Sequence, residues 1–495
     1  MALEFLDSKD GEKTVKVNGM FLHSPYSPKK EAQRFVDLQN CPFKPEYIVI
    51  TEPALSYSLD NLRQKFPGIK IGVIRYSTDF DSYNKGFDFV FYYKLPGSIQ
   101  NQLQAYFTED KLFSVFFISW KPSEKAYENE NNEVWKEIKE SLDFSKTLLV
   151  TRQFFEKKWL INTLNFIKYS KNYYTINKTD LPVIIAASGP SLKENLLTIK
   201  KLENNFLIIA LSSAIPVLLF NDINPDFCMT TDGGYWAKEH LKKLKNYNIP
   251  LAIANEAGCQ KSFLKNLPII PLCYPDGLSK KISSFTDIPF TTAQRNGTIS
   301  GTALELSLEI TSEKIFIFGL DLAEAKAFQH TQPNELEFNS AMFDTKLNSK
   351  EKRTAKQGFK NASLEIYKNW FQNKCLPENK VFRVISNKFK KNSLGQIKDI
   401  TPEAFSLTAE KLIKNGKTKA KGELLKKQDI PANKNLQKIK DFIETNSESE
   451  NWKKSLFPLD YTALLHNPEN EEIQTKLQKE NSRLILKLQK ILNDE

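Results

Sequence analysis

The sequence is poor in cysteine. Its five cysteines, Cys41, Cys228, Cys259, Cys273 and Cys375, are scattered along the chain and form no Cys-x-x-Cys pair. An odd number of dispersed cysteines argues against a disulfide framework and against a structural zinc site. Reduced thiols are typical of the cytoplasm, and we expect this protein to be cytoplasmic.

Long hydrophobic runs are also lacking. The longest, Phe206–Phe220, contains two serines and a proline. It is shorter than the roughly 20 apolar residues that a membrane-spanning helix needs. The first residues, MALEFLDSKDGEK, are acidic and include no apolar stretch of the kind found in secretory signals. We therefore expect no transmembrane segment and no export.

Signatures of nucleic-acid binding are missing as well, since no RNP-type, zinc-finger or helix-turn-helix pattern occurs. The net charge is +11, from 70 basic and 59 acidic residues, and its densest basic stretch is Lys411–Lys427. Such an excess favours an anionic partner, for example a nucleotide. The basic stretch itself is typical of a solvated helical face. We expect no nucleic-acid partner.

Three regions differ in pattern along the 495 residues, more than one hydrophobic core accommodates. Residues 1–150 alternate short β-rich runs with helical stretches, which indicates a small N-terminal α/β domain. Residues 151–400 contain continuously apolar runs that mostly alternate with helical segments, which predicts a doubly wound, mostly parallel, Rossmann-like sheet. Residues 401–495 are rich in Lys and Glu with helical periodicity and predict a C-terminal helical region.

The expected elements can be placed by residue. Outside the central sheet they are a hairpin at Thr14–His23, strands at Tyr47–Thr51, Ile69–Arg75, Phe87–Tyr93 and Leu112–Ser119, and helices at Arg152–Tyr169, Pro402–Asn415, Asn435–Thr445 and Glu471–Leu492. In the central sheet they are strands at Val183–Ala187, Leu207–Leu211, Phe227–Thr231, Leu251–Ala254, Ile269–Leu272, Ile315–Gly319 and Val381–Ile385.

The first candidate motif follows the first strand of the central sheet. It comprises Ser188, Gly189, Pro190 and Ser191, directly before a predicted helix. A turn of this kind presents free backbone N–H groups and a helix N-terminus, which favour an anion such as a phosphate. It matches neither a Walker A loop nor GxGxxG. A tight β–α turn with an ordinary cap is the alternative.

Two further loops are expected at the same edge of the sheet. Asp232 and Gly233 follow the third strand, where an Asp suits a ribose, a sugar or a metal, although it can also cap the next helix. A second small-residue helix entrance contains Asn296, Thr298, Ser300 and Gly301, and an ordinary capped turn is its alternative. If these loops meet the first turn at one rim, together they can hold the phosphate and ribose of a nucleotide.

Asp321 ends a later strand, and His330 follows nine residues on, in a polar loop. The chain has only four histidines. A histidine beyond a strand end has a side chain suited to a base near neutral pH, although most lone histidines are merely hydrogen-bonded. Asp79 and Asp81 form an Asp-x-Asp triplet that can hold a metal in some glycosyltransferases. It lies in the first region, and a surface loop is expected.

An ordered set of these motifs resembles one family. Trp159, Asn162 and Asn165 precede SGPSL at 188–192. Then come NPDF at 224–227, TTDGG at 230–234, NGTISGTALELSLE at 296–309 and FGLDLAE at 318–324. The set is similar to the motility-associated factor (Maf) family of flagellin glycosyltransferases. LHSPYSPKKEA at 22–32 resembles spirochaete-type members of that family.

The resemblance implies a fold and a site. The central domain of the family is shared with 6-hydroxymethylpterin pyrophosphokinase-like proteins and is similar to the sialyltransferases of glycosyltransferase family 42. By that resemblance Ser188, Gly189, Pro190 and Ser191 hold the donor's nucleotide. The rest of the donor site is implied to comprise Asp232, Gly233, Asn296, Thr298, Ser300, Gly301 and Asp321. His330 is the implied base.

The resemblance also implies an inverting transfer. A nonulosonic acid of the pseudaminic or legionaminic class would pass from a CMP-activated donor to Ser or Thr of flagellin, in support of flagellar assembly and motility. No metal or other cofactor would be required. Two alternatives stay open. One is a Mg²⁺-dependent pyrophosphokinase acting on a pterin-like alcohol, in which Asp232 and Asp321 carry the metal. The other is a non-catalytic flagellin-binding protein.

Overall fold

The computed structural model describes residues 3–95, 97–323, 328–334, 337, 342–347, 349, 362–415, 424–429 and 434–493. The chain forms two compact units. Unit 1 combines residues 1–156 with 448–483, and unit 2 combines residues 157–447 with 484–495. The domain boundaries drawn from the sequence, 1–150, 151–400 and 401–495, stay a prediction beside this division. No helix in the described ranges has the length and apolar character needed to cross a membrane.

Unit 1 contains two small sheets. Strands β1 (Leu3–Asp7), β2 (Lys13–Val17) and β3 (Met20–Phe21) pair antiparallel, and the predicted hairpin at Thr14–His23 is confirmed around Asn18 and Gly19. The second sheet is parallel, with strand order β6-β5-β4-β7. Its strands are β4 (Tyr47–Thr51), β5 (Lys70–Arg75), β6 (Phe89–Tyr92) and β7 (Val115–Ser119). All four were expected from their apolar and aromatic runs.

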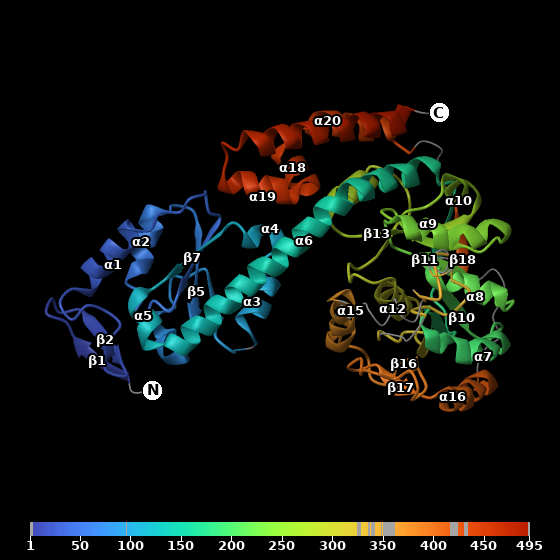
Figure 1. Ribbon diagram of the computed structural model, residues 1–495, viewed down its shortest axis with the longest axis horizontal. Coiled ribbons are helices and arrows are strands. Elements are labelled where there is room, and N and C mark those ends of the chain that lie inside the picture. The colour runs from blue at the N-terminus through green and yellow to red at the C-terminus, as the bar shows by residue number, and fades with distance from the viewer. Residues whose placement is uncertain are drawn as a thin grey trace. The chain divides into compact units, whose positions relative to one another are not determined.

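The helices of unit 1 come from both ends of the chain (Figure 1). They are α1 (Pro28–Asp37), α2 (Ser58–Lys65), α3 (Ile99–Tyr106), α4 (Glu109–Leu112), α5 (Lys121–Ala126), α18 (Glu450–Leu456) and α19 (Pro458–His466), with the 3-10 segment η1 (Thr78–Tyr83). Of the three boundaries between the two units, one falls inside α6 (Glu128–Tyr169), one inside α20 (Glu471–Asn493), and one in the short link before α18. Helix α6 begins well before the predicted start at Arg152, because its first half is polar and shows little apolar periodicity.

The Asp-x-Asp triplet lies in η1, where Asp79 and Asp81 are exposed and Phe80 is buried between them. Ser77 accepts a hydrogen bond from the Asp79 N–H, and Asp81 accepts one from the Tyr92 hydroxyl. The expectation of a surface position for this triplet is confirmed.

Unit 2 is built on one large sheet with the strand order β17-β16-β15-β9-β10-β11-β12-β13-β8-β18, and β14 pairs with β13. Its strands are β8 (Asn172–Ile176), β9 (Val183–Ala186), β10 (Leu207–Leu211), β11 (Phe227–Thr230), β12 (Leu251–Ala254), β13 (Pro268–Cys273), β14 (Thr291–Thr292), β15 (Ile315–Phe318), β16 (Val381–Val384), β17 (Lys398–Ile400) and β18 (Leu425–Gln428). All pairings are parallel except that of β18 with β8.

The connecting helices of unit 2 fall between these strands, so the predicted doubly wound fold class is confirmed. They are α7 (Leu196–Lys201), α8 (Ile215–Phe220), α9 (Tyr235–Leu241), α10 (Lys261–Asn266), α11 (Gly277–Ser283), α12 (Ile299–Ile310), α15 (Ala362–Asn373) and α16 (Pro402–Asn415), with 3-10 segments η2 (Pro190–Asn195), η3 (Ser212–Ala214) and η4 (Lys242–Asn246). Helix α17 (Leu436–Asn446) follows β18.

The core of unit 2 lies on the central strands. Every residue of β9, β10, β11 and β12 is buried, as their uninterrupted apolar sequences require. Helix α16 adds Phe405, whose ring lies 4.9 Å from the rings of both Phe316 and Phe318. Edge-to-face pairs of this kind stabilise a core by roughly 0.5–1.5 kcal/mol each beyond burial. Residues 402–415 thus pack on the sheet of unit 2.

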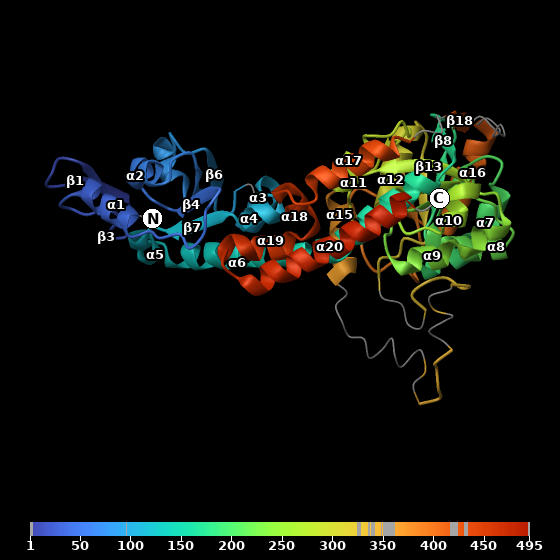
Figure 2. The same cartoon turned by 90° about the horizontal axis from the view of Figure 1, so that it is seen from above.

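The order in which strands are added to the sheet changes sides at β9. From β9 the sheet extends through β10 to β13 on one side, and it then resumes on the other side with β15, β16 and β17. The topological switch point therefore lies between β9 and β15, where ligands bind in sheets of this kind. At the far edge, Figure 2 shows β8, β13 and β18 side by side.

Candidate active site

The loops that carry the predicted site residues leave one edge of the sheet. Strands β9, β11 and β15 run parallel, so the loops after them, which hold Ser188, Asp232 and Asp321, emerge together at the carboxyl edge. Helix α12 begins at the same edge, because it follows β14, which runs parallel to β13. The structure therefore places all three predicted loops along one rim of unit 2.

The turn after β9 is closed by Asp321. Its carboxylate accepts a hydrogen bond from the Ser191 N–H at 2.9 Å and another from the Ser191 hydroxyl. The Gly189 N–H donates to the Gly319 carbonyl at 2.8 Å. The expectation of free N–H groups at this turn is therefore wrong for Gly189 and Ser191, because β15 and its loop supply their acceptors.

Asp321, a residue that is 7% exposed, places its carboxylate where the sequence suggested an anion. Burial raises the pKa of its carboxyl, although the two bonds from Ser191 oppose that shift. The segment after Gly189 is also a 3-10 segment of six residues, where an α-helix was expected. This turn consequently offers a bound phosphate fewer free N–H donors than the sequence indicated.

Two glycines let the loops after β9 and β15 approach closely. A Cβ atom at Gly189 would lie 2.4 Å from the Gly319 carbonyl oxygen and 2.8 Å from the Asp321 carboxyl. Gly319 has φ of +67°, and a Cβ atom there would lie 2.3 Å from the Ala187 carbonyl oxygen. Since no side chain fits at either position, both residues are required by packing.

The loop of His330 is fastened to the same turn. The Thr331 N–H donates to the Ser188 carbonyl at 2.7 Å, and the Thr331 hydroxyl donates to the Gly189 carbonyl at 2.6 Å. The structure thus brings the predicted base next to the predicted donor turn. Glu324, which ends the FGLDLAE motif, lies outside the described residues.

Glu337 organises the His330 loop, and no sequence pattern singled it out. Its carboxylate accepts hydrogen bonds from the N–H groups of Gln329 and His330, at 2.6 Å and 3.0 Å. The Nδ1 atom of His330 lies 3.4 Å from the same carboxylate, in an ion-pair contact that lacks hydrogen-bond geometry. The His330 side chain is 33% exposed, so a substrate can reach it.

The loop of Asp232 is held by helix α6. The Asn162 side chain donates to the backbone carbonyls of Gly233 and Glu256, at 3.3 Å and 2.8 Å. A Cβ atom at Gly233 would lie 2.6 Å from the Trp159 ring. Asp232 itself accepts from the Gly234 N–H at 2.8 Å, so in this structure it closes its own turn. Trp159 and Asn162 of the family-like motif therefore act here as supports.

The entrance to α12 is shaped by Asn296. Its side-chain oxygen accepts from the Thr298 N–H at 3.1 Å, and a Cβ atom at Gly301 would lie 2.7 Å from the Asn296 amide. Thr298 caps the helix by accepting from the Ser300 N–H at 3.3 Å. The Asn296 amide nitrogen is buried and has no partner in the described part of the chain, so it is positioned to donate to a ligand.

Tyr274, which follows β13, lies beside this entrance, because the guanidinium of the neighbouring Arg295 is 4.3 Å from the centroid of its ring. The predicted residues thus form two groups along one rim, one around Asp321 and one around Asn296. Helix α12 contacts β9, β10, β11 and β15, the strands beneath both groups. Among the described residues no hydrogen bond joins Asp321 directly to Asp232 or Ser300, so a ligand long enough to contact both groups suits this rim.

Sequence reasoning missed the side chains around Arg295. Its guanidinium lies between the rings of Trp159 and Tyr274, 4.8 Å and 4.3 Å from their centroids. It donates to Glu256 at 2.9 Å and to Asp276 at 3.0 Å. Glu256, Tyr274 and Asp276 all follow the carboxyl ends of strands, and this position was the signal that could have revealed them.

Glu256 is the most enclosed charge of that cluster, with 2% of its side chain exposed. Burial raises the pKa of its carboxyl, and Arg295 acts in the opposite direction. Its second oxygen is buried without a hydrogen-bond partner among the residues that the structure describes. Within the same ranges, no group of three His, Cys, Asp or Glu side chains is arranged to hold a metal ion.

Comparison with known proteins gives the wider context. Residues 157–327 match the family model described as 6-hydroxymethylpterin diphosphokinase MptE-like, which covers the sheet from β8 to β15 and most of the candidate residues. An uncharacterized protein of Treponema pallidum (strain Nichols) is 30% identical over 309 residues, spanning 62% of this chain and 68% of the relative. This chain belongs to the family of that spirochaete protein.

Among solved structures, the MAf glycosyltransferase from Magnetospirillum magneticum AMB-1 is similar in fold to this family member. The TM-score is 0.51 at 12% identity, and the match covers 99% of this chain and 90% of the other. At this identity the likeness concerns the fold. The expected resemblance in architecture to a Maf protein is therefore confirmed.

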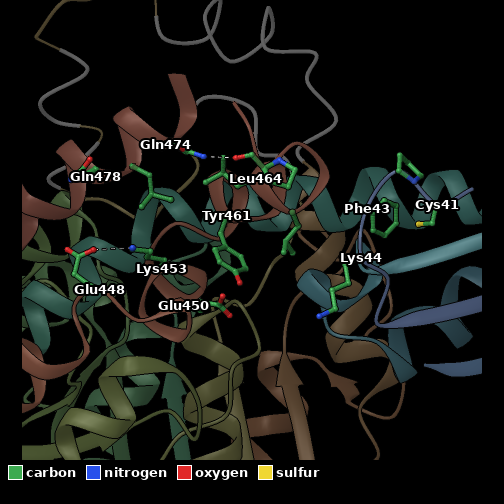
Figure 3. Close-up of a pocket in the computed structure, with 14 residues that line it drawn as sticks. Cys41, Phe43, Lys44, Glu448, Glu450, Lys453, Tyr461, Leu464, Gln474 and Gln478 are labelled. Atoms are coloured by element: carbon green, nitrogen blue, oxygen red, sulfur yellow. Dashed lines mark hydrogen bonds and ion pairs between the residues drawn. The ribbon is translucent and has the colours of Figure 1, made fainter. Parts of the chain in front are cut away.

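Unit 1 holds a separate hollow of about 740 Å³, drawn in Figure 3. Its walls are the 41–44 loop and helices α18, α19 and α20. Phe43, Tyr461 and Leu464 point into it, and the Glu448–Lys453 ion pair lies at its rim, with 3.0 Å between nitrogen and oxygen. None of the predicted site residues lines this hollow, so they and it are separate features.

Proposed function

We propose that this protein is a glycosyltransferase that moves a sugar from a nucleotide-activated donor to a hydroxyl group of a protein. The likeness in fold to a Maf glycosyltransferase over 99% of the chain supports this proposal. The observation that carries it is the attachment of the His330 loop to the turn at Ser188 and Gly189, at the switch point of the sheet. A candidate base and a nucleotide-binding edge coincide there.

For the donor we propose a CMP-linked nonulosonic acid of the pseudaminic or legionaminic class. Its phosphate is best accommodated at the N-terminus of α12. That twelve-residue helix carries a partial positive charge at its entrance, and the N–H groups of Ile299 and Gly301 have no intrahelical acceptor. The unpartnered amide nitrogen of Asn296 adds a donor. Ser188, Gly189, Pro190, Ser191 and Asp321 then shape the neighbouring wall.

The transfer breaks the bond between the sugar's anomeric carbon and the phosphate oxygen, and CMP leaves with the electron pair. The acceptor hydroxyl attacks the opposite face, and its oxygen forms the new bond with inversion. Its proton passes to His330, whose imidazolium is stabilised by the Glu337 carboxylate 3.4 Å away. Base assistance of this kind contributes about 10²–10⁴-fold to the rate. No cofactor takes part in these proposed steps.

For the acceptor we propose Ser or Thr residues of flagellin, modified in the cytoplasm in support of flagellar assembly and motility. The test is the intact mass of flagellin from cells that have or lack this protein, where we expect the loss of one or more sugar masses. His330→Ala should give the same loss, and His466→Ala, which changes an exposed histidine in unit 1, should not. An unchanged flagellin mass in cells lacking the protein would exclude this acceptor.

The match of residues 157–327 to the MptE-like family supports a second candidate, a Mg²⁺-dependent pyrophosphokinase acting on a pterin-like alcohol. That reaction needs a divalent cation to neutralise the transferred phosphates. Turnover of a CMP-sugar in the presence of EDTA would favour the glycosyltransferase. Turnover of ATP with 6-hydroxymethylpterin that EDTA abolishes would favour the kinase.

A further inference from the structure

Two large aromatic side chains are exposed at the rim that carries the candidate site. Tyr235 is 65% exposed and Trp236 is 40% exposed. They open α9 directly after the loop of Asp232, at the carboxyl end of β11. Proteins bury most of a tryptophan on average, and large apolar side chains that gather at one exposed place mark binding surfaces. Their position at this rim therefore indicates that they contact a ligand of the candidate site.

Helix α9 is connected to the loop of His330 through η3, the short segment after β10. Helix α9 contacts η3 directly. Within η3 the Ser213 hydroxyl lies 2.8 Å from the Ser188 hydroxyl, and the Ser213 carbonyl accepts from the Asn334 side chain at 3.4 Å. Ser188 belongs to the turn after β9, and Asn334 belongs to the loop of His330. The segment η3 thus joins the aromatic pair to the candidate base.

The aromatic pair stands beside the nucleotide-binding crevice and does not line it. The switch point lies between β9 and β15, and β10 separates β9 from β11, the strand that leads to the pair. A nucleotide held at the switch point therefore leaves the two rings free to contact a second substrate. That substrate must reach His330 from the side of the crevice.

The two rings form a notch. Their centroids are 5.3 Å apart and their planes are inclined at 74°. A sugar ring stacks on one flat aromatic face, whereas two planes at this angle enclose an apolar side chain between them. Tyr and Trp are also the residues that most often dominate the binding energy of protein interfaces. The geometry therefore favours a polypeptide over a saccharide as the occupant.

We propose that Tyr235 and Trp236 form the subsite that binds the acceptor polypeptide. The two rings hold an apolar side chain of the acceptor and thereby present a nearby serine or threonine hydroxyl to His330. This inference rests on the proposed glycosyltransferase function and names the residues that select its acceptor.

The test compares the full chain with Tyr235→Ala and Trp236→Ala, using fluorescein-labelled flagellin from cells that lack this protein. Each substitution should weaken flagellin binding and raise the KM for flagellin at least tenfold, as expected for an aromatic anchor of an interface. The KM for the CMP-sugar, measured by its hydrolysis without a polypeptide, should stay the same. Tyr235→Phe keeps the ring and should bind flagellin like the wild type.

Tyr247→Ala is the matched control. Tyr247 is also 40% exposed, but it precedes β12 and so lies at the opposite edge of the sheet from the candidate site. Its loss should change neither flagellin binding nor either KM. Urea unfolding of each variant shows whether the substitution has altered the fold.

Transfer with the wild-type KM for flagellin in both alanine variants would overturn this inference and leave the proposed function standing. A raised KM for the CMP-sugar would overturn it too, since the rings would then hold the donor. Loss of flagellin binding in alanine variants of a protein that transfers no sugar would support the subsite and refute the proposed function. If the wild type does not bind flagellin, the inference fails, whereas hydrolysis of the CMP-sugar would still support a transferase with another acceptor.

Discussion

At the scale of single residues, the Asp321 carboxylate takes the position that the turn after β9 offers to an anion. It binds both the N–H and the hydroxyl of Ser191, and it is almost fully buried. An internal carboxylate of this kind fixes the turn before any ligand arrives. The turn is therefore preorganised, and its shape depends on one charged side chain.

Asp321→Asn should destabilise unit 2 by about 1–3 kcal/mol, because an amide cannot accept both hydrogen bonds from Ser191 in the present geometry. Transfer from a CMP-sugar should fall in parallel, since the neighbouring wall of the site loses its shape. Urea unfolding and initial rates measure the two effects. Asp222→Asn, at a surface position where the side chain is 86% exposed, is the matched control and should change neither.

His23 gives unit 1 a dependence on pH. Burial, with Arg75 as a second cause, lowers the pKa of His23 to about 3, and its Nε2 atom accepts from the Leu55 N–H at 3.1 Å. The unfolded chain binds a proton near pH 6.5, whereas the folded chain does not. This contribution to stability is full above pH 6.5 and is lost as the pH falls toward 3.

Between pH 7 and pH 5, unit 1 should accordingly lose about 2 kcal/mol through this one group. Urea unfolding followed by hydrogen exchange of peptides from residues 47–119 measures that loss. His23→Gln should remove most of the difference between the two pH values, and His466→Gln should leave it in place. An equal loss in wild-type protein and His23→Gln would contradict the assignment.

At the scale of elements, the closeness of the loops after β9 and β15 sets the geometry of the switch point. Gly189 and Gly319 let one backbone approach the other so closely that the Gly189 N–H bonds to the Gly319 carbonyl. Helix α12 covers the strands beneath. The position of Asp321 relative to Ser191 is therefore a consequence of how β15 ends.

Gly319→Ala should cost more than Gly277→Ala, although both glycines have positive φ, +67° and +77°. A Cβ atom at Gly277 meets nothing within 4 Å, so only the left-handed backbone, worth about 1–2 kcal/mol, is penalised. At Gly319 the added atom also meets the Ala187 carbonyl oxygen, and the backbone must shift to relieve that contact. We expect this strain to lower the free energy of unfolding in urea by a further 1–3 kcal/mol or so, as at other strained sites. We also expect the proposed sugar transfer to be lost.

Most strands of the two larger sheets could be predicted because their apolar runs are short, continuous and separated by polar segments. Four strands of the unit 2 sheet were not predicted. Asn172–Ile176 (β8) is only partly buried, Leu425–Gln428 (β18) is mostly polar, and β14 and β17 are only two and three residues long. β8 and β18 pair with each other at the margin of the sheet, where burial on both faces is not required. Their position in the folded sheet determines that they are strands, and their sequences show no apolar periodicity that would predict it.

At the scale of the whole molecule, the candidate site is completed by residues beyond the stretch 157–327. The buried Arg383 donates to the Leu320 carbonyl at 3.3 Å and to Asn392 at 2.8 Å. Asn392 in turn donates to the carbonyls of Asp321 and Leu322, at 3.2 Å and 2.8 Å. Strand β16 and the loop after it thus hold the backbone of Asp321 in place.

Asn392→Ala should lower the stability of unit 2 by about 1–3 kcal/mol, since it removes a donor from two backbone carbonyls and an acceptor from the Arg383 guanidinium. It should also lower kcat for transfer, because Asp321 is no longer fixed. Asn373→Ala, at an exposed position at the end of α15, is the comparison and should leave both values unchanged. Loss of stability with full kcat would limit Asn392 to a structural role.

The sequence allowed the three loops to be assigned to one rim, because parallel strands fix where their ends lie. It did not reveal the partners within the rim. Arg295 contacts Trp159 from a helix more than a hundred residues earlier, and Glu337 contacts His330 across a loop with no regular pattern. Such contacts depend on where side chains lie in the folded chain. Hydrophobic periodicity in a single sequence predicts helices and strands, but it does not predict which side chains meet.

Unit 1 is assembled from the first and last parts of the chain, and this has a consequence for its synthesis on a ribosome. Asp460, on α19, accepts from the Gln153 side chain at 2.8 Å, yet about 290 residues separate the two pieces. At the usual pace of translation that interval lasts roughly 15–60 s. During that time unit 2 emerges from the ribosome. The surface of the amino-terminal piece that later packs against α18 and α19 stays uncovered until those helices have been made.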